Sequence, residues 1–265
     1  MKKLFLCDID GTILDGSRNM PNISEKTKYA IRELTKEHYV FIASGRNKRL
    51  LNKQIFDLNP NGYILCNGAY AEVDGKEIVS EFYNQETVNK IIETSLNNNG
   101  FYVLETLNRL FVNDIKAEQF IKFLSAWGTS LEGFENRPVL EGKYHIAMIG
   151  FSKEADCQKA EKELNDYVDI ARHHDFLSYD LNIKGINKGL CAEKVIKYLG
   201  IDHENTYCFG DGINDLEMLQ AVGHPVMMAN ADKRLREYHF EETDDVIDDG
   251  LYNYLVRNQL IKPIK

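Results

Sequence analysis

Short apolar runs alternate with amphipathic stretches through the first third of the chain. Residues 4–7 form an unbroken apolar run that ends in acidic residues, which predicts a buried strand whose carboxyl end opens into a loop. Residues 24–37 carry apolar side chains at helical spacing, and residues 39–43 and 63–66 predict two more buried strands. A second helix is expected directly after Ser44-Gly45-Arg46. This β-α-β-α order predicts a parallel sheet with helices on both faces.

The pattern changes after a tight hairpin. Asp74-Gly75 separates two short strands, and this dipeptide supplies the positive φ angles that a two-residue turn needs. The following segment predicts helix 86–97, strands 101–105 and 109–112, helix 117–125, strand 144–151, helix 154–165, and strands 168–171 and 177–183. Elements in this order form an open α+β sheet layer of their own, and we interpret the segment as an inserted domain.

The parallel pattern returns near residue 188. The expected elements are a helix to residue 199, a strand at 206–209, an acidic loop at 210–215, a helix to 221, a strand at 226–228 and further helices. Residues 241–245 are acidic and predict an exposed loop. The predicted fold class is therefore α/β, with a parallel-sheet core formed by residues 1–82 and 185–265 and an inserted α+β domain at 83–184.

Composition narrows the range of partners and compartments. A formal net charge of −9 argues against nucleic acid and anionic membrane, because a polyanion partner needs a basic face. Acidic residues interrupt the N-terminal apolar run, so no export signal is expected, and no stretch approaches the ~18 apolar residues of a membrane span. Five scattered cysteines without a CxxC pair predict buried reduced thiols. We expect a cytoplasmic protein with no obligate protein partner.

Acidic residues and glycines follow the strongest predicted strands. They lie in segments 8–12, 44–46 and 210–215. Because ligands of open parallel sheets bind at the carboxyl ends of the strands, these segments are expected to converge on one crevice. Four carboxylates gathered there would repel one another strongly without a cation, and all-oxygen ligation suits Mg²⁺.

Asp8 and Asp10 lie two residues apart on an extended chain, so both carboxylates are expected to face the crevice. Asp8 can attack phosphorus as a nucleophile once a cation offsets its repulsion from the phosphate. Asp10 is placed to protonate the leaving oxygen and then to activate water against the aspartyl-phosphate. Asp211 is the expected third metal ligand, and Asn214 and Asp215 are expected to orient it or to bind a metal-bound water.

Donors for the phosphate oxygens are also available. Ser44 offers a hydroxyl, and Gly45 offers a backbone N–H at the start of the expected helix, where the helix dipole favours an anion. Lys188 opens the first helix after the insertion and can bring a cation to the phosphate and to the Asp8 carboxylate. Taken singly, Lys188 is best explained as a surface lysine, and residues 44–46 could be only a strand-to-helix turn with a capping serine. Because they occur together with the two acidic segments, they become candidate phosphate contacts.

Together these residues resemble the haloacid dehalogenase superfamily of phosphatases, and within it the Cof-type branch. The family motifs occur in order as Asp8-Ile-Asp-Gly-Thr, Ser44-Gly-Arg, Lys188 and Gly210-Asp-Gly-Ile-Asn-Asp, and the similarity covers essentially the whole chain. The resemblance implies a Rossmann-like core, a cap inserted between the second and third motifs, and Mg²⁺ bound by Asp8, the backbone carbonyl of Asp10, and Asp211. It also implies phosphate contacts from Ser44, Gly45, Lys188 and Asn214.

The expected function is a magnesium-dependent phosphatase that hydrolyses a small phosphorylated metabolite, either a sugar phosphate, a nucleotide or a cofactor phosphate. Three alternatives stay open at this point: phosphoryl transfer to another sugar hydroxyl, as in phosphomutases, a phosphoaspartate switch similar to a receiver domain, and a binding protein without activity. Asp10 argues against the switch, because a base beside the acyl phosphate would shorten its lifetime. The sequence does not identify the substrate.

Overall fold

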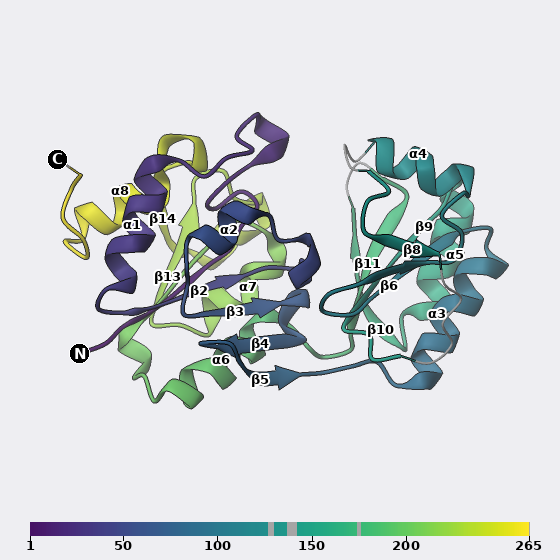
Figure 1. The fold of residues 1–265 in the computed structure, drawn as a ribbon, viewed down its shortest axis with the longest axis horizontal. Helices are drawn as coiled ribbons and strands as arrows, with labels where there is room; N and C mark the ends of the chain where they lie inside the picture. The colour runs from purple at the N-terminus through teal and green to yellow at the C-terminus, as the bar shows by residue number, and fades with distance from the viewer. Residues whose placement is uncertain (127–129, 137–141, 174–175, 265) are drawn as a thin grey trace. The chain divides into compact units, whose positions relative to one another are not determined.

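The computed structural model describes residues 1–126, 130–136, 142–173 and 176–264 (Figure 1). Contacts between residues divide the chain into two compact units. The first contains Met1–Arg46, Leu50–Val79 and Asn187–Lys265, and the second contains Asn47–Arg49 and Ser80–Ile186. Each unit is organised around one sheet and has its own apolar clusters.

The first unit is built on an eight-stranded sheet in the order β14-β13-β12-β1-β2-β3-β4-β5. Its strands are β1 (Leu4–Cys7), β2 (Tyr39–Ala43), β3 (Gly62–Leu65), β4 (Tyr70–Val73), β5 (Lys76–Ser80), β12 (Thr206–Gly210), β13 (His224–Met228) and β14 (Glu241–Thr243). The strands from β14 to β3 are parallel, and β4 pairs antiparallel with β3. Asp74 and Gly75 both have positive φ in the predicted turn before β5. The sheet is therefore mixed, and its central strands are parallel.

Helices cover both faces of this sheet. They are α1 (Glu25–Thr35), α2 (Lys53–Asp57), α6 (Lys188–Leu199), α7 (Leu216–Gln220) and α8 (Gly250–Arg257). Cys208 of β12 belongs to the apolar cluster that includes the buried residues of α6 and α7. Its neighbour Phe209 packs edge-on against Tyr254 of α8, with ring centroids 5.3 Å apart. Successive strand residues point to opposite faces, so α8 lies on the face opposite to α6 and α7.

Two local expectations for this unit are wrong. No helix begins directly after Ser44-Gly45-Arg46: a single 3₁₀ turn at Lys48–Leu50 comes first, and α2 starts only at Lys53, where Asn52 caps it by accepting a hydrogen bond from Ile55 N–H. The acidic segment 241–245 is not wholly an exposed loop, because Glu241–Thr243 forms the edge strand β14. Thr243 is buried there, and its hydroxyl donates to the Gly250 carbonyl at 2.7 Å.

The second unit contains a six-stranded sheet in the order β10-β11-β9-β6-β7-β8. Its elements are α3 (Gln85–Asn97), β6 (Phe101–Glu105), β7 (Leu110–Val112), α4 (Glu118–Ala126), β8 (Phe134–Asn136), β9 (Ile146–Gly150), α5 (Glu154–Leu164), β10 (Val168–Arg172) and β11 (Ser178–Ile183). All its pairs are antiparallel except β7 with β8. The alternation along β6 supplies two cores: Tyr102 and Leu104 pack in the cluster that includes α5, and Phe101 and Val103 pack with α4.

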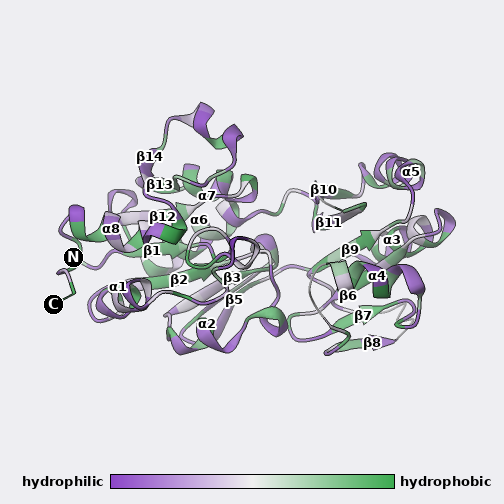
Figure 2. Ribbon diagram, turned by 90° about the horizontal axis from the view of Figure 1, so that it is seen from above, coloured by the Kyte–Doolittle hydropathy of each residue, from purple (hydrophilic) through white to green (hydrophobic). Residues whose placement is uncertain are grey.

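The predicted fold class, an α/β core with an inserted second sheet, is confirmed. Hydrophobic residues concentrate along the strands of both sheets, whereas the helices mix hydrophobic and hydrophilic residues (Figure 2). All five cysteines are buried free thiols, as predicted. The short strand β8 was not predicted, because its three residues include Glu135 and Asn136 and show no apolar run. In the second unit the sequence pattern identifies the longer strands and misses only this edge strand among the described residues.

Candidate functional site

Four parallel strands of the first unit end side by side and send their next residues into adjacent loops. The strands are β12, β1, β2 and β3, and their registers place their carboxyl ends along one edge of the sheet. The loops that follow begin at Asp211, Asp8, Ser44 and Cys66. Parallel pairing therefore brings together the three segments that were predicted to carry the chemistry, 8–12, 44–46 and 210–215. It also adds a fourth loop, which begins at Cys66.

Lys188 forms the buried centre of this edge. Its ammonium group lies 2.6 Å from Asp8 Oδ1 and 2.7 Å from Asp215 Oδ1, and the side chains of Lys188 and Asp215 are each 1% exposed. Asn187 caps α6 by accepting from Leu190 N–H, which fixes the position of Lys188 in the first turn. Removing one member of such a buried group leaves an unpaired charge, a change that costs about 3–5 kcal/mol.

Asp211 joins the same cluster from the loop after β12. Its Oδ1 accepts a hydrogen bond from Thr12 Oγ1 at 3.0 Å. A Cβ on Gly11, whose φ is +89°, would lie 2.0 Å from Asp211 Oδ2, so only glycine permits this close approach. Asp215 Oδ2 accepts from the backbone N–H groups of Asp211 and Gly212, which ties the loop to the buried lysine.

The donor set fits a divalent cation with oxygen ligands. One carboxylate oxygen from each of Asp8, Asp211 and Asp215 lies within 4.8 Å of the others. Burial, and then the charge of Asp215, raises the pKa of Asp8 well above its usual range and that of Asp211 to about 7. Burial alone would lower the pKa of Lys188, but Asp215 and Asp8 raise it, so the lysine is charged. One ammonium group cannot offset two buried carboxylates and a third that is half-buried, and a divalent cation would restore the balance.

The Asp10 carboxylate does not join this cluster. It is 51% exposed and is bound by Arg46 through two hydrogen bonds, from Nε to Oδ2 at 2.9 Å and from Nη2 to Oδ1 at 2.7 Å. Asp8, by contrast, points to Lys188. Ile9 between them is fully buried, as the two-residue spacing predicts. The two acids expected to share the chemistry are thus held by different cations.

The expected phosphate donors lie in the neighbouring loops. Ser44 is buried at the end of β2, and its Oγ accepts from the Arg46 N–H at 3.2 Å. Gly45 follows, but the helix expected there is missing, so the helix-dipole argument for an anion at Gly45 is wrong. Asn214 is exposed, and its Nδ2 donates to Asn67 Oδ1 at 3.2 Å.

Three residues of this edge were missed by the sequence reasoning: Thr12, Arg46 and Asn67. Thr12 and Arg46 stood inside recognised motifs, yet neither had a role assigned. Their hydrogen bonds to Asp211 and Asp10 depend on which loops meet at the sheet edge, which the chain order alone does not specify. Asn67 follows β3, and its position at the end of a predicted strand was the available signal.

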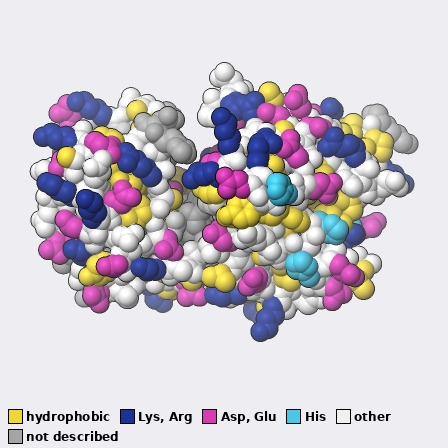
Figure 3. Space-filling model, turned by 180° about the vertical axis from the view of Figure 1, so that it is seen from behind, with side chains coloured by type: hydrophobic (Ala, Val, Ile, Leu, Met, Phe, Trp, Pro, Cys, Tyr) yellow, Lys and Arg dark blue, Asp and Glu magenta, His cyan; other side chains and the backbone are white. Residues whose placement is uncertain are grey.

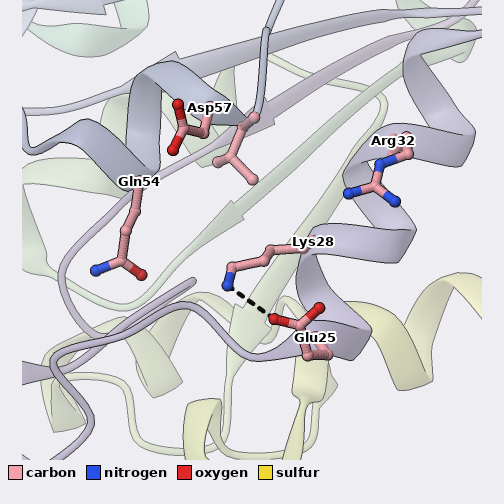
Figure 4. A pocket seen from close by; sticks show the side chains of 6 residues that line it. Glu25, Lys28, Arg32, Gln54 and Asp57 are labelled. Atoms are coloured by element: carbon pink, nitrogen blue, oxygen red, sulfur yellow. Dashed lines mark hydrogen bonds and ion pairs between the residues drawn. The ribbon is translucent and has the colours of Figure 1, made fainter.

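A separate hollow of about 290 Å³ lies beside α1 and α2 (Figure 4). It is lined by Glu25, Lys28, Arg32, Gln54, Asp57 and Leu58. Three of its charged side chains are already paired, since Lys28 Nζ lies 2.9 Å from Glu25 Oε1 and Asp57 pairs with Lys53. The hollow shares no lining residue with the acid–lysine cluster, that is, Asp8, Lys188, Asp211 and Asp215. It is therefore not the site of the predicted chemistry.

Among the described residues, no helix is both long enough and apolar enough to cross a membrane. On the face drawn in Figure 3, Lys and Arg side chains are intermixed with Asp and Glu.

Known proteins share both the sequence pattern and the fold. Residues 5–255 match the family described as haloacid dehalogenase-like hydrolase. YkrA of Bacillus subtilis (strain 168), whose designation as a phosphatase is itself provisional, is 29% identical over 250 residues, which cover 94% of this chain and 95% of YkrA. YitU of the same strain, a 5-amino-6-(5-phospho-D-ribitylamino)uracil phosphatase, is 25% identical over 263 residues, with 95% and 96% covered.

Solved structures agree on the fold. A hypothetical protein of Geobacillus kaustophilus HTA426 superposes with a TM-score of 0.88 at 24% identity, covering 98% of this chain and 100% of the other. The subclass IIB sugar phosphatase BT4131 gives a TM-score of 0.82 at 24% identity, with the same coverage. The family match extends from β1 into α8 and so includes the whole acid–lysine cluster. The chain belongs to the haloacid dehalogenase-like hydrolases of the Cof type and is a phosphatase, that is, a phosphoric monoester hydrolase.

Proposed function

We propose that this phosphatase hydrolyses a small phosphorylated metabolite through a phosphoryl group carried on Asp8. The observation that supports this most is the buried contact of Lys188 with Asp8 and Asp215 at the carboxyl edge of the parallel strands. A lysine held there keeps Asp8 oriented and offers its positive charge to an incoming phosphate. A carboxylate that is desolvated and held in one position is suited to attack phosphorus.

In the first step, an Asp8 carboxylate oxygen forms a bond to phosphorus while the bond from phosphorus to the ester oxygen breaks. Asp10, in its protonated form, gives its proton to the departing alkoxide, which leaves as an alcohol. Ser44, Gly45, Lys188 and Asn214 are proposed to hold the phosphate oxygens during this transfer. Arg46 must share or release Asp10 at this stage, because its two N–H groups occupy both carboxylate oxygens.

In the second step, Asp10 takes a proton from a water molecule, and the water oxygen bonds to phosphorus. The bond between Asp8 and phosphorus then breaks, inorganic phosphate leaves, and Asp10 holds the proton it needs for the next cycle. In this step Asp10 starts as a carboxylate, the form whose two oxygens can accept both hydrogen bonds from Arg46. Arg46 therefore supports the base role of Asp10 more than its acid role.

Mg²⁺ is the proposed cofactor, held by Asp8, the backbone carbonyl of Asp10, and Asp211. When bound, it would supply positive charge to the phosphate oxygens and the attacking carboxylate. Asp215 and Thr12 orient this set through Lys188, the loop amides and Asp211. All of these residues belong to the first unit, and the second unit is proposed to act as a cap that selects the rest of the substrate.

The substrate class is proposed from the relatives: YitU acts on a phosphorylated ribityl compound, and BT4131 is a sugar phosphatase. A phosphate ester of a polyhydroxylated alcohol is therefore the first class to test. The experiment is a screen of sugar phosphates, nucleotides and cofactor phosphates with Mg²⁺, in which kcat/KM ranks the compounds and released inorganic phosphate is measured. Appearance of a phosphorylated second product in place of free phosphate would overturn hydrolysis in favour of a mutase.

A further inference from the structure

The loop after β3 has an uncommon backbone for a buried position. Cys66, Asn67 and Gly68 all have positive φ, at 54°, 51° and 96°. This conformation raises the free energy of a non-glycine residue, and it does so least for asparagine. Among the described non-glycine residues with positive φ, Cys66 and Asn67 are the buried ones; the other three such asparagines, Asn19, Asn59 and Asn99, are exposed. A surface turn alone does not account for this loop.

Backbone hydrogen bonds attach this loop to the phosphate-donor loop after β2. Cys66 N–H donates to the Arg46 carbonyl at 3.0 Å, and Asn67 N–H donates to the Ser44 carbonyl at 3.2 Å. The left-handed backbone thus presents the Asn67 side chain to the segment 44–46. A Cβ on Gly45 would lie 2.9 Å from Asn67 Oδ1 and 3.2 Å from its Nδ2, so the carboxamide packs directly against Gly45.

The same carboxamide also reaches the acidic loop after β12. Asn67 Oδ1 accepts a hydrogen bond from Asn214 Nδ2 at 3.2 Å, across 147 residues of sequence. One N–H of Asn214 is used by this bond, and its second N–H remains available for a phosphate oxygen. Asn67 is therefore in contact with two of the residues proposed to hold the phosphate, Gly45 and Asn214.

We propose that Asn67 is a positioning residue that fixes the Asn214 carboxamide and the Gly45 backbone for phosphate binding. This inference rests on the proposed function, since it takes Asn214 and Gly45 as phosphate contacts. Asn67 acts through these neighbours, and the left-handed backbone at positions 66 and 67 is the conformation that places its side chain between the two loops. Supporting groups of this kind typically change activity or affinity by about 10–100-fold when removed.

Asn67→Gly separates this role from a structural one. Glycine adopts a φ of 51° without strain, so the variant keeps the turn and loses only the carboxamide. We expect kcat/KM for an aryl phosphate to fall about 10–100-fold and competitive inhibition by inorganic phosphate to weaken to a similar extent. The melting temperature should stay at or above that of the wild type. Asn59→Gly is the matched control, because Asn59 has a φ of 49°, is exposed and follows α2, and its activity should not change.

A double-mutant cycle tests whether Asn67 acts through Asn214. In an Asn214→Ala background, Asn67→Gly should cost clearly less than in the wild type, because the Asn214 carboxamide is already gone and only the contact with Gly45 is left to lose. Equal losses in both backgrounds, or a loss below about 2-fold in the single variant, would overturn the proposal. If Asn67→Gly does not fold, Asn67→Ala removes the same carboxamide, and Asn59→Ala is its control for a methyl side chain at a positive φ.

Different outcomes would contradict the phosphate contact at Asn214 and the positioning role of Asn67. If Asn214→Ala loses no activity, the phosphate contact at Asn214 and the positioning role of Asn67 are both wrong, while the nucleophile at Asp8 is untouched. If Asn214→Ala loses activity and Asn67→Gly does not, only the positioning role is wrong. Whether the reaction proceeds through Asp8 is tested separately, by the Asp8→Asn variant.

Discussion

The two sheets of this protein differ in strand direction, and the chemistry follows that difference. In the first unit, β12, β1, β2 and β3 run parallel, so the loops after them lie along one edge. In the second unit, β11, β9, β6 and β7 alternate in direction, so successive strand ends lie at opposite edges. The group of three potential metal ligands found among the described residues, Asp8, Asp211 and Asp215, lies in the first unit. Parallel order gathers polar residues that are remote in sequence, whereas the antiparallel sheet is packed with apolar side chains on both faces.

The largest effect is expected from Asp8→Asn. It removes the attacking charge and one ligand of the cation, so kcat should fall by about 10⁴-fold or more. Asp166→Asn, an exposed site in the second unit, is the matched control and should change kcat by less than about 2-fold. Steady-state kinetics on both purified variants checks the contrast. Substantial activity in pure Asp8→Asn protein would remove the proposed mechanism from the first unit.

The metal dependence of activity tests whether the carboxylates of the first unit bind a cation. Chelation should abolish activity, Mg²⁺ should restore it, and Ca²⁺ should inhibit, because its larger and looser coordination shell misplaces the nucleophile. Burial and Asp215 raise the pKa of Asp211 to about 7, so protons compete with the cation below that pH. The Mg²⁺ concentration for half-maximal activity should therefore rise by up to about tenfold per pH unit as pH falls below 7. Full activity in excess chelator, or one activation constant at pH 6 and pH 8, would contradict the assignment.

The sequence predicted the site correctly where the parallel order of the strands alone determines which residues come together. Hydrophobic runs predicted β1, β2 and β12, and the residues after them form the expected acidic edge. It failed where a contact depends on loop geometry. The partners of Asp10 and Asn214 are Arg46 and Asn67, and no periodicity indicates which side chains cross between loops. The helix expected after Arg46 was wrong because Asn52, further along, provides the N-terminal cap.

Arg46→Lys should sharpen the roles of the two acids within the first unit. Lysine keeps the charge but cannot make the two parallel hydrogen bonds that hold Asp10. Because Arg46 supports Asp10 as the base of the second step, kcat for an aryl phosphate with a good leaving group, whose first step is fast, should fall about tenfold. Its kcat/KM, which reports only the steps through departure of the first alcohol, should fall much less. The comparison of the loss in kcat with the loss in kcat/KM is the measurement. Equal losses would mean that Arg46 contacts the phosphate or supports the fold.

The smallest effect is expected in the second unit, at Glu105. Burial, and then the charge of Asp180, raises the pKa of Glu105 to about 8. The folded chain then holds a proton that the unfolded chain releases between pH 4.5 and 8, so this group lowers stability as pH rises through that window. Glu105→Gln should raise the melting temperature by roughly 2–4 °C at pH 8.5 and leave it unchanged at pH 4.5. Kinetics at saturating Mg²⁺ should show unchanged activity on an aryl phosphate. An equal change in melting temperature at both pH values would exclude titration of Glu105 as the cause.

The central claim is that Asp8 carries the phosphoryl group, and it can be tested by trapping that group. Asp10→Asn protein, which lacks the base for the second step, is mixed with an aryl phosphate and Mg²⁺, quenched in acid within the first turnover, and mapped by peptide mass spectrometry. The account predicts one phosphoryl group on the peptide that contains Asp8, and none when Asp8→Asn is combined with Asp10→Asn. A phosphoryl group on another residue, or product release with no labelled peptide at any quench time, would contradict it.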